Sequence, residues 1–162
     1  LSGNFGIQDI SPLRGLTSLQ DLDLSTIRSV VDIAPLSELV ALTTLDLSGN
    51  SIRDVSALSG LVALTYLYLG HNSITDIEPL RELVALRSLV LDDNSITNVS
   101  VVSGLAELSY LTLPNNSITN ISPLTALTEL SYVVVVGNPI DCGSDALARL
   151  RASVPYFYDD CP

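Results

Sequence analysis

The chain has 162 residues and a formal net charge of −11, from 18 acidic residues against seven arginines. This length favours a single domain, and an apolar fraction of 47% is enough to form a core. The charge argues against binding to nucleic-acid phosphates or to anionic membrane surfaces, and no apolar run approaches the length of a membrane span. We therefore expect neither a nucleic-acid partner nor direct membrane insertion.

The first 16 residues carry apolar side chains at steps of three, at Ile7, Ile10, Leu13 and Leu16. The same steps return in later copies of a repeated unit, so this segment is interpreted as the trailing part of one more copy. Stacked repeats normally end in a polar cap, and no such cap precedes Phe5. We predict an exposed apolar end around Phe5, Ile7 and Ile10, to be covered by a missing segment or by self-association.

A unit of 22 residues then repeats along the chain. Four regular copies begin at Leu42, Leu64, Leu86 and Leu108, and a fifth opens at Leu130. A repeat of this length indicates a solenoid, because one copy cannot bury its apolar side chains alone but stacked copies can. The period therefore decides the fold class before any single element is assigned.

Each unit predicts a short strand followed by a looser segment. In the first regular copy, Leu45 and Leu47 flank Asp46, and this alternation indicates a strand with one face turned inward. The next apolar residues, from Ile52 to Leu61, step by three, which suits short 3₁₀ pieces better than a long α-helix. Stacked copies would place parallel strands about 4.8 Å apart.

An asparagine follows each strand, three residues after the last apolar strand residue. A side-chain amide both donates and accepts, so it can satisfy backbone groups of its own turn and of the neighbouring turn. We assign a structural role to Asn50, Asn72, Asn94, Asn116 and Asn138.

The copy at residues 19–42 differs, because it has 23 residues and its insertion falls within residues 25–31. Ile27 stands there at the asparagine position. We expect a turn that is built differently, and we interpret it as loop variation.

The combined pattern L-x-x-L-x-L-x-x-N-x-I-x-D-I-x-P-L-x-x-L resembles a leucine-rich repeat. More narrowly, it resembles the 22-residue class of bacterial internalins and of a nuclear phosphatase regulatory subunit. The signature Asp-Ile-Xaa-Pro-Leu occurs at residues 9–13, 32–36 and 76–80, with an asparagine variant at 120–124. The resemblance implies an α/β leucine-rich-repeat solenoid, right-handed, with a parallel β-sheet on the concave face and short 3₁₀ or loop segments on the convex face. It implies binding far more often than catalysis.

The end of the chain departs from the repeat. Ser144 suits the N-cap of a short helix over roughly residues 145–153. The segment from Asn138-Pro139 to the terminal Asp-Cys-Pro resembles the C-terminal caps of extracellular leucine-rich repeat proteins, with two cysteines where animal caps usually have four. We expect a solenoid with about six strand-bearing turns over residues 1–141 and a cap over residues 142–162, together forming one cooperative domain without an N-terminal cap.

Cys142 and Cys161 are the only cysteines, one in each arm of this cap. A reactive thiol or a metal pair are the alternatives, although two cysteines without a nearby histidine make a poor zinc site. We favour a structural disulfide, which requires an oxidising compartment. We therefore expect a bacterial protein that is extracellular or at the cell surface, or periplasmic, and that carries no cofactor or metal.

The outward strand positions should stack into columns on the concave face. One column contains Asp21, Thr44, Tyr66, Ser88, Tyr110 and Tyr132, and the next contains Asp23, Asp46, Tyr68, Val90, Thr112 and Val134. We predict a protein-binding patch of Tyr66, Tyr68, Val90, Tyr110, Tyr132 and Val134, beside an acidic part formed by Asp21, Asp23 and Asp46. Tyrosine is favoured at interface anchors, although strand propensity alone also places tyrosine on strands.

A third column contains Thr26, Gly49, His71, Asp93, Asn115 and Gly137, and it places His71 beside Asp93 on the same face. A His–Asp pair suggests catalysis, but no serine elbow or free cysteine accompanies it. A metal site of His71, Asp92 and Asp93 is an alternative, although a flat sheet rarely converges enough ligands. We interpret His71 and Asp93 as binding-face residues that form one cross-strand pair.

The leading hypothesis is a non-enzymatic binding module of a secreted or cell-surface protein, with a protein or peptide docked on the concave face. Two alternatives stay open. The chain could be a structural spacer or stalk of a larger adhesin, with no ligand on that face. The face could instead be a glycan-binding platform.

Overall fold

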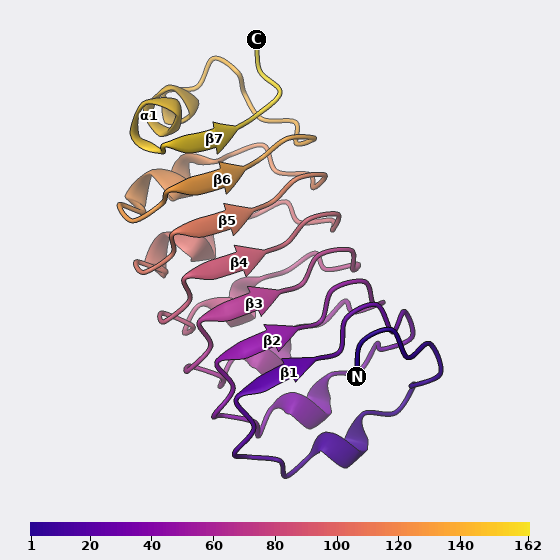
Figure 1. Ribbon diagram of the computed structural model, residues 1–162. Coiled ribbons are helices and arrows are strands. Elements are labelled where there is room, and N and C mark those ends of the chain that lie inside the picture. Colours follow the sequence, from indigo (N-terminus) through magenta and orange to yellow (C-terminus); the bar gives the residue numbers. More distant parts are fainter.

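The computed structural model describes all 162 residues, which form a right-handed solenoid with one open, parallel, seven-stranded sheet. The strands follow one another across the sheet in chain order (Figure 1). They are β1 (Asp21–Asp23), β2 (Thr44–Asp46), β3 (Tyr66–Tyr68), β4 (Ser88–Val90), β5 (Tyr110–Thr112), β6 (Tyr132–Val134) and β7 (Tyr156–Tyr158). The predicted fold class is confirmed.

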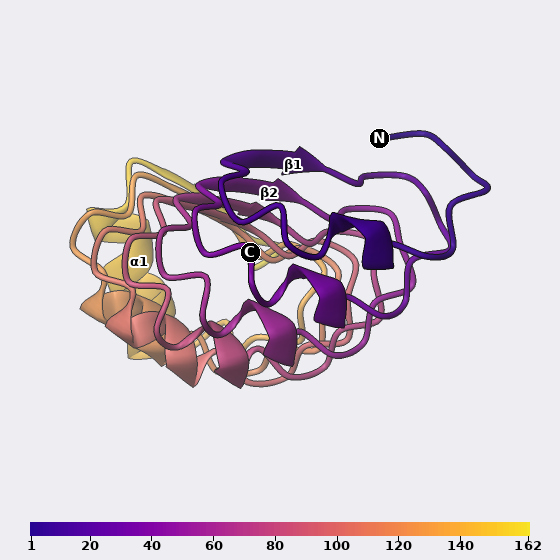
Figure 2. The same ribbon diagram turned by 90° about the horizontal axis from the view of Figure 1, so that it is seen from below.

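Short 3₁₀ helices line the side opposite the sheet, and one α-helix precedes the last strand (Figure 2). They are η1 (Ser11–Leu13), η2 (Ala34–Leu36), η3 (Ser56–Leu58), η4 (Glu78–Leu80), η5 (Ser100–Gly104), η6 (Ser122–Ala126) and α1 (Asp145–Ser153). The Asp-Ile-Xaa-Pro-Leu signature explains how the 3₁₀ helices begin. In η4, Asp76 Oδ1 accepts a hydrogen bond from the Glu78 N–H at 2.9 Å, and Pro79 lies in the first turn, where it needs no donor.

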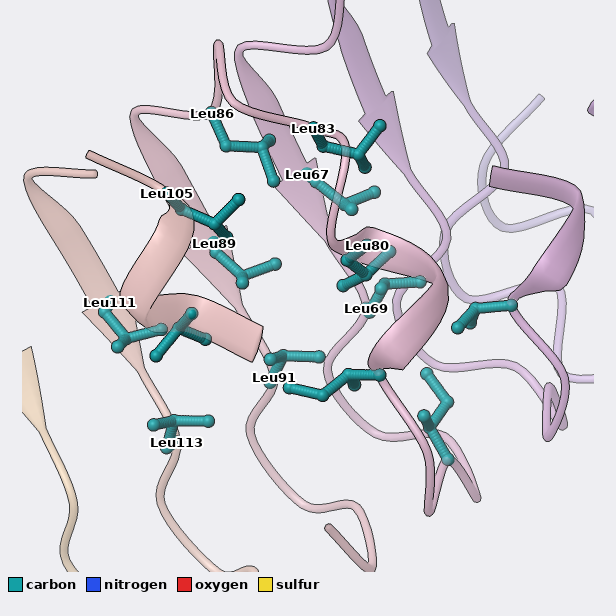
Figure 3. Packing of buried hydrophobic residues seen from close by; sticks show 14 of the residues in the cluster. Leu67, Leu69, Leu80, Leu83, Leu86, Leu89, Leu91, Leu105, Leu111 and Leu113 are labelled. Carbon is teal, nitrogen blue, oxygen red and sulfur yellow. The ribbon is translucent and has the colours of Figure 1, made fainter. Parts of the chain in front are cut away.

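Side chains from successive coils form one continuous core of 44 buried residues, from Ile10 to Val154. Figure 3 shows leucines of neighbouring strands, Leu67 and Leu89, pointing into the interior together with Leu80 of η4. Each buried leucine contributes about 1.5–3 kcal/mol, but only when a neighbouring coil covers it. The stability of each coil therefore depends on the coils above and below it.

The asparagine ladder ties each turn to the one before it. Asn116 Nδ2 donates to the Leu91 carbonyl of the preceding coil at 3.0 Å and to the Leu113 carbonyl of its own coil at 3.1 Å. Its Oδ1 accepts from the Ile96 N–H of the preceding coil at 2.9 Å. The same set recurs at Asn72, Asn94 and Asn138. These bonds satisfy buried backbone groups and hold the coils in register.

Asn50 breaks this pattern, because its buried Oδ1 has no hydrogen-bond partner. Its Nδ2 still donates to the Leu24 and Leu47 carbonyls, at 2.8 and 3.0 Å. The missing donor traces to the longer turn of the preceding coil, where Ile27 is buried and Arg28 adopts a left-handed φ of 67°. The one-residue insertion therefore removes one side-chain hydrogen bond between these two coils.

The N-terminal prediction is correct only in part. Phe5 is 64% exposed, and the Arg28 guanidinium lies 5.2 Å from the centre of its ring. Ile7 is half-buried, whereas Ile10 is only 3% exposed. The expectation that Ile10 lies in an exposed end is therefore wrong. Ile10 immediately precedes η1, and η1 packs on η2, so Ile10 joins the core.

The C-terminal cap contains the predicted helix and a strand that was not predicted. Ser144 Oγ accepts from the Leu147 N–H at 3.3 Å at the start of α1, and Leu147 and Leu150 are buried. α1 spans nine residues, and no helix of the protein has the length and apolarity needed to cross a membrane. After α1, β7 pairs with β6 and turns Phe157 toward the core. The sheet therefore continues through the cap.

Covalent and ionic contacts hold the arms of the cap together. Cys142 and Cys161 form the disulfide, with their Cα atoms 5.4 Å apart. Arg151, near the end of α1, donates from Nε and Nη2 to the two carboxylate oxygens of Asp159, at 3.0 and 2.6 Å. It also donates to the Cys161 carbonyl at 2.7 Å. These hydrogen bonds connect the helix to the disulfide-bonded terminal segment.

The asparagine ladder can be tested with two buried members that differ by one bond. Asn116→Ala should lower the free energy of unfolding by about 2–4 kcal/mol, because the Ile96 N–H loses its acceptor and the Leu91 and Leu113 carbonyls each lose one of their two asparagine donors. Asn50→Ala should cost about 1 kcal/mol less, since its Oδ1 accepts no bond. Urea denaturation with the disulfide intact measures both. Equal losses would show that the side-chain acceptor bond adds nothing.

The Arg151–Asp159 contact should make stability depend on pH. The hydrogen bond from Arg151 lowers the pKa of Asp159, and the Cys161 N–H adds to this effect. A lowered folded-state pKa stabilises the fold above the unfolded value of about 3.9 and loses this effect as the pH falls through the folded value. Asp159→Asn should therefore cost about 1–2 kcal/mol at pH 7 and clearly less at pH of about 2.5, which lies below the unfolded value. Denaturant unfolding at the two pH values provides the comparison, and an equal cost at both would contradict the assignment.

Candidate binding surface

The strand register aligns the outward side chains in columns across the sheet. Tyr66 pairs with Ser88, Ser88 with Tyr110, and Tyr110 with Tyr132. The neighbouring column runs from Asp23 and Asp46 through Tyr68, Val90 and Thr112 to Val134. Tyr66 and Tyr110 are exposed, and Tyr68, Val90, Tyr132 and Val134 are half-buried. These side chains thus lie side by side on one face.

The last strand adds two tyrosines that the sequence analysis missed. Tyr156 continues the column of Tyr132, and Tyr158 continues the column of Val134. All six tyrosines of the protein therefore lie on this sheet. The alternation Tyr-Phe-Tyr at residues 156–158 was the signal for a strand with both tyrosines outward.

The tyrosines pack against one another in a row. The Tyr110 and Tyr132 rings are stacked, with centroids 4.6 Å apart and an interplanar angle of 6°. Tyr132 also contacts Tyr156 and Tyr158, at centroid distances of 6.4 and 5.5 Å. Mutual packing of this kind fixes the rings before any partner arrives, which lowers the ordering cost of binding. We call these four residues the tyrosine row.

A hollow of about 560 Å³ opens in the middle of the face, and Ser88 is 8% exposed at its base. Its lining consists of Tyr66, Tyr68, Arg87, Ser88, Val90, Ser109 and Tyr110. Three of these residues, Arg87, Ser88 and Ser109, were not among the predicted site residues. Arg87 is paired with Glu107 at 3.6 Å. We call this hollow the Ser88 slot.

Tyr110 stands at the edge of the Ser88 slot, and its pKa is raised. Burial is the main cause, and interactions with the neighbouring Tyr132 and with the Asp92 carboxylate act in the same direction. Tyr110 therefore presents a neutral hydroxyl at pH 7.

The acidic part of the face has a structural role as well as a charge. Asp23 Oδ1 accepts from the Ser25 N–H and hydroxyl at 2.8 and 2.7 Å, and the Ser25 hydroxyl is the main cause of the lowered pKa of Asp23. Asp46 Oδ1 accepts from the Ser48 N–H at 2.8 Å. Both carboxylates thus stabilise the turns that end their strands. With Asp21 they line a second hollow of about 330 Å³.

The third column consists entirely of residues in the left-handed region. Thr26, Gly49, His71, Asp93, Asn115 and Gly137 all have φ between 51° and 74°. Glycine adopts this conformation without a Cβ penalty, and asparagine, aspartate and histidine adopt it more readily than the β-branched threonine. His71 Nδ1 lies 3.2 Å from Asp93 Oδ2, and Asn115 Nδ2 donates to Asp93 Oδ1 at 2.9 Å. The structure thus contains a lateral chain of three polar side chains along this column.

These residues do not form an arrangement suited to metal binding. Asp92 accepts a hydrogen bond from the Thr112 hydroxyl, whereas Asp93 faces His71. No three His, Cys, Asp or Glu side chains converge into a set that could hold a metal ion.

The left-handed column makes a specific prediction for His71. His71→Gly should raise the free energy of unfolding by roughly 0.5–1 kcal/mol, because the relieved backbone strain exceeds the added chain entropy of glycine. Gly49→Ala, in the same column, should lower it by about 1 kcal/mol or more, since a Cβ there would lie 3.3 Å from Thr26 Cα. Urea denaturation measures the free energy of unfolding of both variants. A clear loss of stability in His71→Gly would mean that the contact with Asp93 outweighs the strain.

The chain is similar to known leucine-rich repeat proteins. A family model described as leucine-rich repeats (2 copies) matches residues 40–82 and 62–106. Comparison with curated protein sequences gives no match.

Among solved structures, internalin C2 of Listeria monocytogenes has a TM-score of 0.87 and 33% identity, over 95% of this chain and 67% of that one. Internalin F of the same organism has a TM-score of 0.79 and 32% identity, over 89% of this chain and 48% of that one. The ectodomain of the Arabidopsis thaliana receptor kinase GASSHO1/SCHENGEN3, in complex with CASPARIAN STRIP INTEGRITY FACTOR 2, has a TM-score of 0.74 and 26% identity, over 91% of this chain and 19% of that one. The repeat, the disulfide-bonded cap and these similarities together show that the chain belongs to the internalin-like class of leucine-rich repeat proteins.

Proposed function

We propose that this chain is a non-enzymatic binding module of a secreted or cell-surface bacterial protein, and that it recognises a protein partner through the concave sheet face. The observation that carries the proposal is the tyrosine row with the adjoining Tyr66 and Tyr68, which places every tyrosine of the chain on one surface. Leucine-rich repeat domains generally mediate protein binding, and this face is the part of the surface best suited to it.

The chemistry of the face supports a protein partner. Tyrosine combines a large apolar area with a hydroxyl and has few rotatable bonds, so it contributes to an interface at a low entropic cost. The acidic residues Asp21, Asp23 and Asp46 lie at one end of the same sheet and would direct a partner of complementary charge. Chemistry on a substrate would require a nucleophile or a metal-ligand set, and neither accompanies the His71–Asp93 pair.

The proposed location rests on the disulfide and on the relatives. The Cys142–Cys161 bond forms and persists in an oxidising compartment. The similarity to the internalins and to the plant receptor ectodomain supports the same location. The chain spans 48% of internalin F and 19% of the plant ectodomain. Any activity of a longer protein that contains this chain is therefore also a proposal.

The face can be tested with a double substitution, Tyr68→Ala with Tyr110→Ala. The immobilised wild type is used to capture a protein from material taken from its natural surroundings. The double variant should retain at least about tenfold less of that protein, because two central anchors are lost. The melting temperature should fall by at most about 4 °C, since outward aromatic contacts contribute only about 1 kcal/mol.

A matched control comes from exposed apolar residues outside the sheet, Val62→Ser with Val84→Ser. This variant should capture the same protein as the wild type. If the tyrosine variant also captured it undiminished, the partner would bind outside the concave face, and if the wild type captured nothing, the chain would be a spacer or stalk. If stability fell as steeply as capture, the tyrosines would be structural.

A further inference from the structure

The Ser88 slot is a gap of one ring in a column that is otherwise aromatic from Tyr66 to Tyr156. Register places Tyr66 and Tyr110 on either side of Ser88, two strands apart. At about 4.8 Å per strand, their backbones are about 9.6 Å apart. This is close to twice the 4.6 Å that separates the stacked Tyr110 and Tyr132 rings. One planar group placed over Ser88 would therefore lie within stacking distance of both neighbours.

The walls and base of the slot are preformed. Tyr132 supports Tyr110 from behind by stacking, so that wall is fixed. Ser88 forms the base with Val90, and the hydroxyl of Ser109 lines the rim. Serine at the base leaves an accepting hydroxyl oxygen where a tyrosine would otherwise fill the space. The slot thus combines two aromatic side chains with polar groups at its base and rim.

The surroundings of the slot favour a cation. Asp46 pairs in register with Tyr68 on one flank, and Asp92 accepts from Thr112, which pairs with Val90 on the other. Arg87, the one basic residue of the lining, is already paired with Glu107. The net charge of −11 adds a long-range attraction for basic surfaces. A neutral ring would fit the shape of the slot, and a cation would in addition be attracted by the acidic residues beside it and by the net charge of the protein.

We infer that the Ser88 slot binds an arginine side chain presented by a basic segment of a protein partner. This inference rests on the proposed function and names the chemistry that the concave face recognises. The planar guanidinium stacks between Tyr66 and Tyr110, and its N–H groups donate to the serine hydroxyls at the base and rim. Lysine carries the same charge but has no planar group to stack, so the slot discriminates between the two.

Two peptides of equal charge, hexa-arginine and hexa-lysine, test the inference. Binding can be followed by the intrinsic fluorescence of the protein, which contains six tyrosines and no tryptophan, because all six tyrosines lie on the sheet. At an ionic strength of about 0.15 M, which screens general attraction, hexa-arginine should bind at least about tenfold more tightly than hexa-lysine.

Filling the slot should abolish this preference. Ser88→Tyr places a ring in the gap and should reduce hexa-arginine affinity to that of hexa-lysine, about tenfold. Thr44→Tyr is the matched control, since Thr44 pairs with Tyr66 on its other side and leaves the slot open; its affinities should stay within about twofold of wild type. Tyr66→Leu keeps an apolar wall without an aromatic face and should also lose the preference, which provides a second test should Ser88→Tyr fail to fold.

Equal affinity for the two peptides, or an arginine preference that survives Ser88→Tyr and Tyr66→Leu, would overturn the inference. Binding of neutral triacetylchitotriose that Ser88→Tyr removes, without any arginine preference, would overturn it in favour of a glycan site. Capture of a protein partner that depends on Tyr68 and Tyr110 but not on Ser88 would refute only the slot and leave the proposed function standing. Capture that depends on none of them would refute the proposed function itself.

Discussion

The side-chain hydrogen bonds of the asparagine ladder are the constraint on which the rest of this structure depends. Each amide joins the backbone of its own turn to that of the turn before, so that residues 22 apart in the chain become neighbours in space. A slip of one residue would turn every outward strand side chain into the core. The leucine core supplies most of the stabilisation, and leucine burial and the ladder require the same register. That register creates the columns of the concave face.

Much of this architecture could be predicted from the sequence, because it is repeated or local. Strand alternation around Leu45, the asparagine ladder and the Ser144 N-cap each depend on a few nearby residues, and repetition removes ambiguity. β7 was missed because Tyr156 follows Tyr132 by 24 positions rather than 22, since α1 replaces the usual turn. Burial of Ile10 was missed because it depends on how η1 packs on η2. A sequence assigns residues to a column, but it does not give ring planes, so neither the Tyr110–Tyr132 stack nor the Ser88 slot could be foreseen.

Several side chains on the face have a structural role that is independent of the proposed binding. Asp23 and Asp46 complete the turns after their strands while they keep a negative charge toward solvent. Their presence alone therefore does not indicate a ligand. His71 is a further case, because a glycine would relieve its left-handed backbone, whereas the imidazole contacts Asp93. Tyrosine is common on strands, but the support of each ring by the next is a property of this arrangement.

The Asn50 oxygen, which has no hydrogen-bond partner, makes the two ends of the solenoid unequal in their resistance to unfolding. In a linear array, where each coil touches only its neighbours, unravelling starts at the weakest junction and spreads from there. The junction between the first two strand-bearing coils lacks one side-chain hydrogen bond that every later asparagine makes. The C-terminal coil is instead held by a disulfide and by the Arg151–Asp159 ion pair. Under a pulling force the coils would unfold in one direction, from β1 toward β7. The tyrosine row, which occupies the last strands, would be among the final parts to come apart.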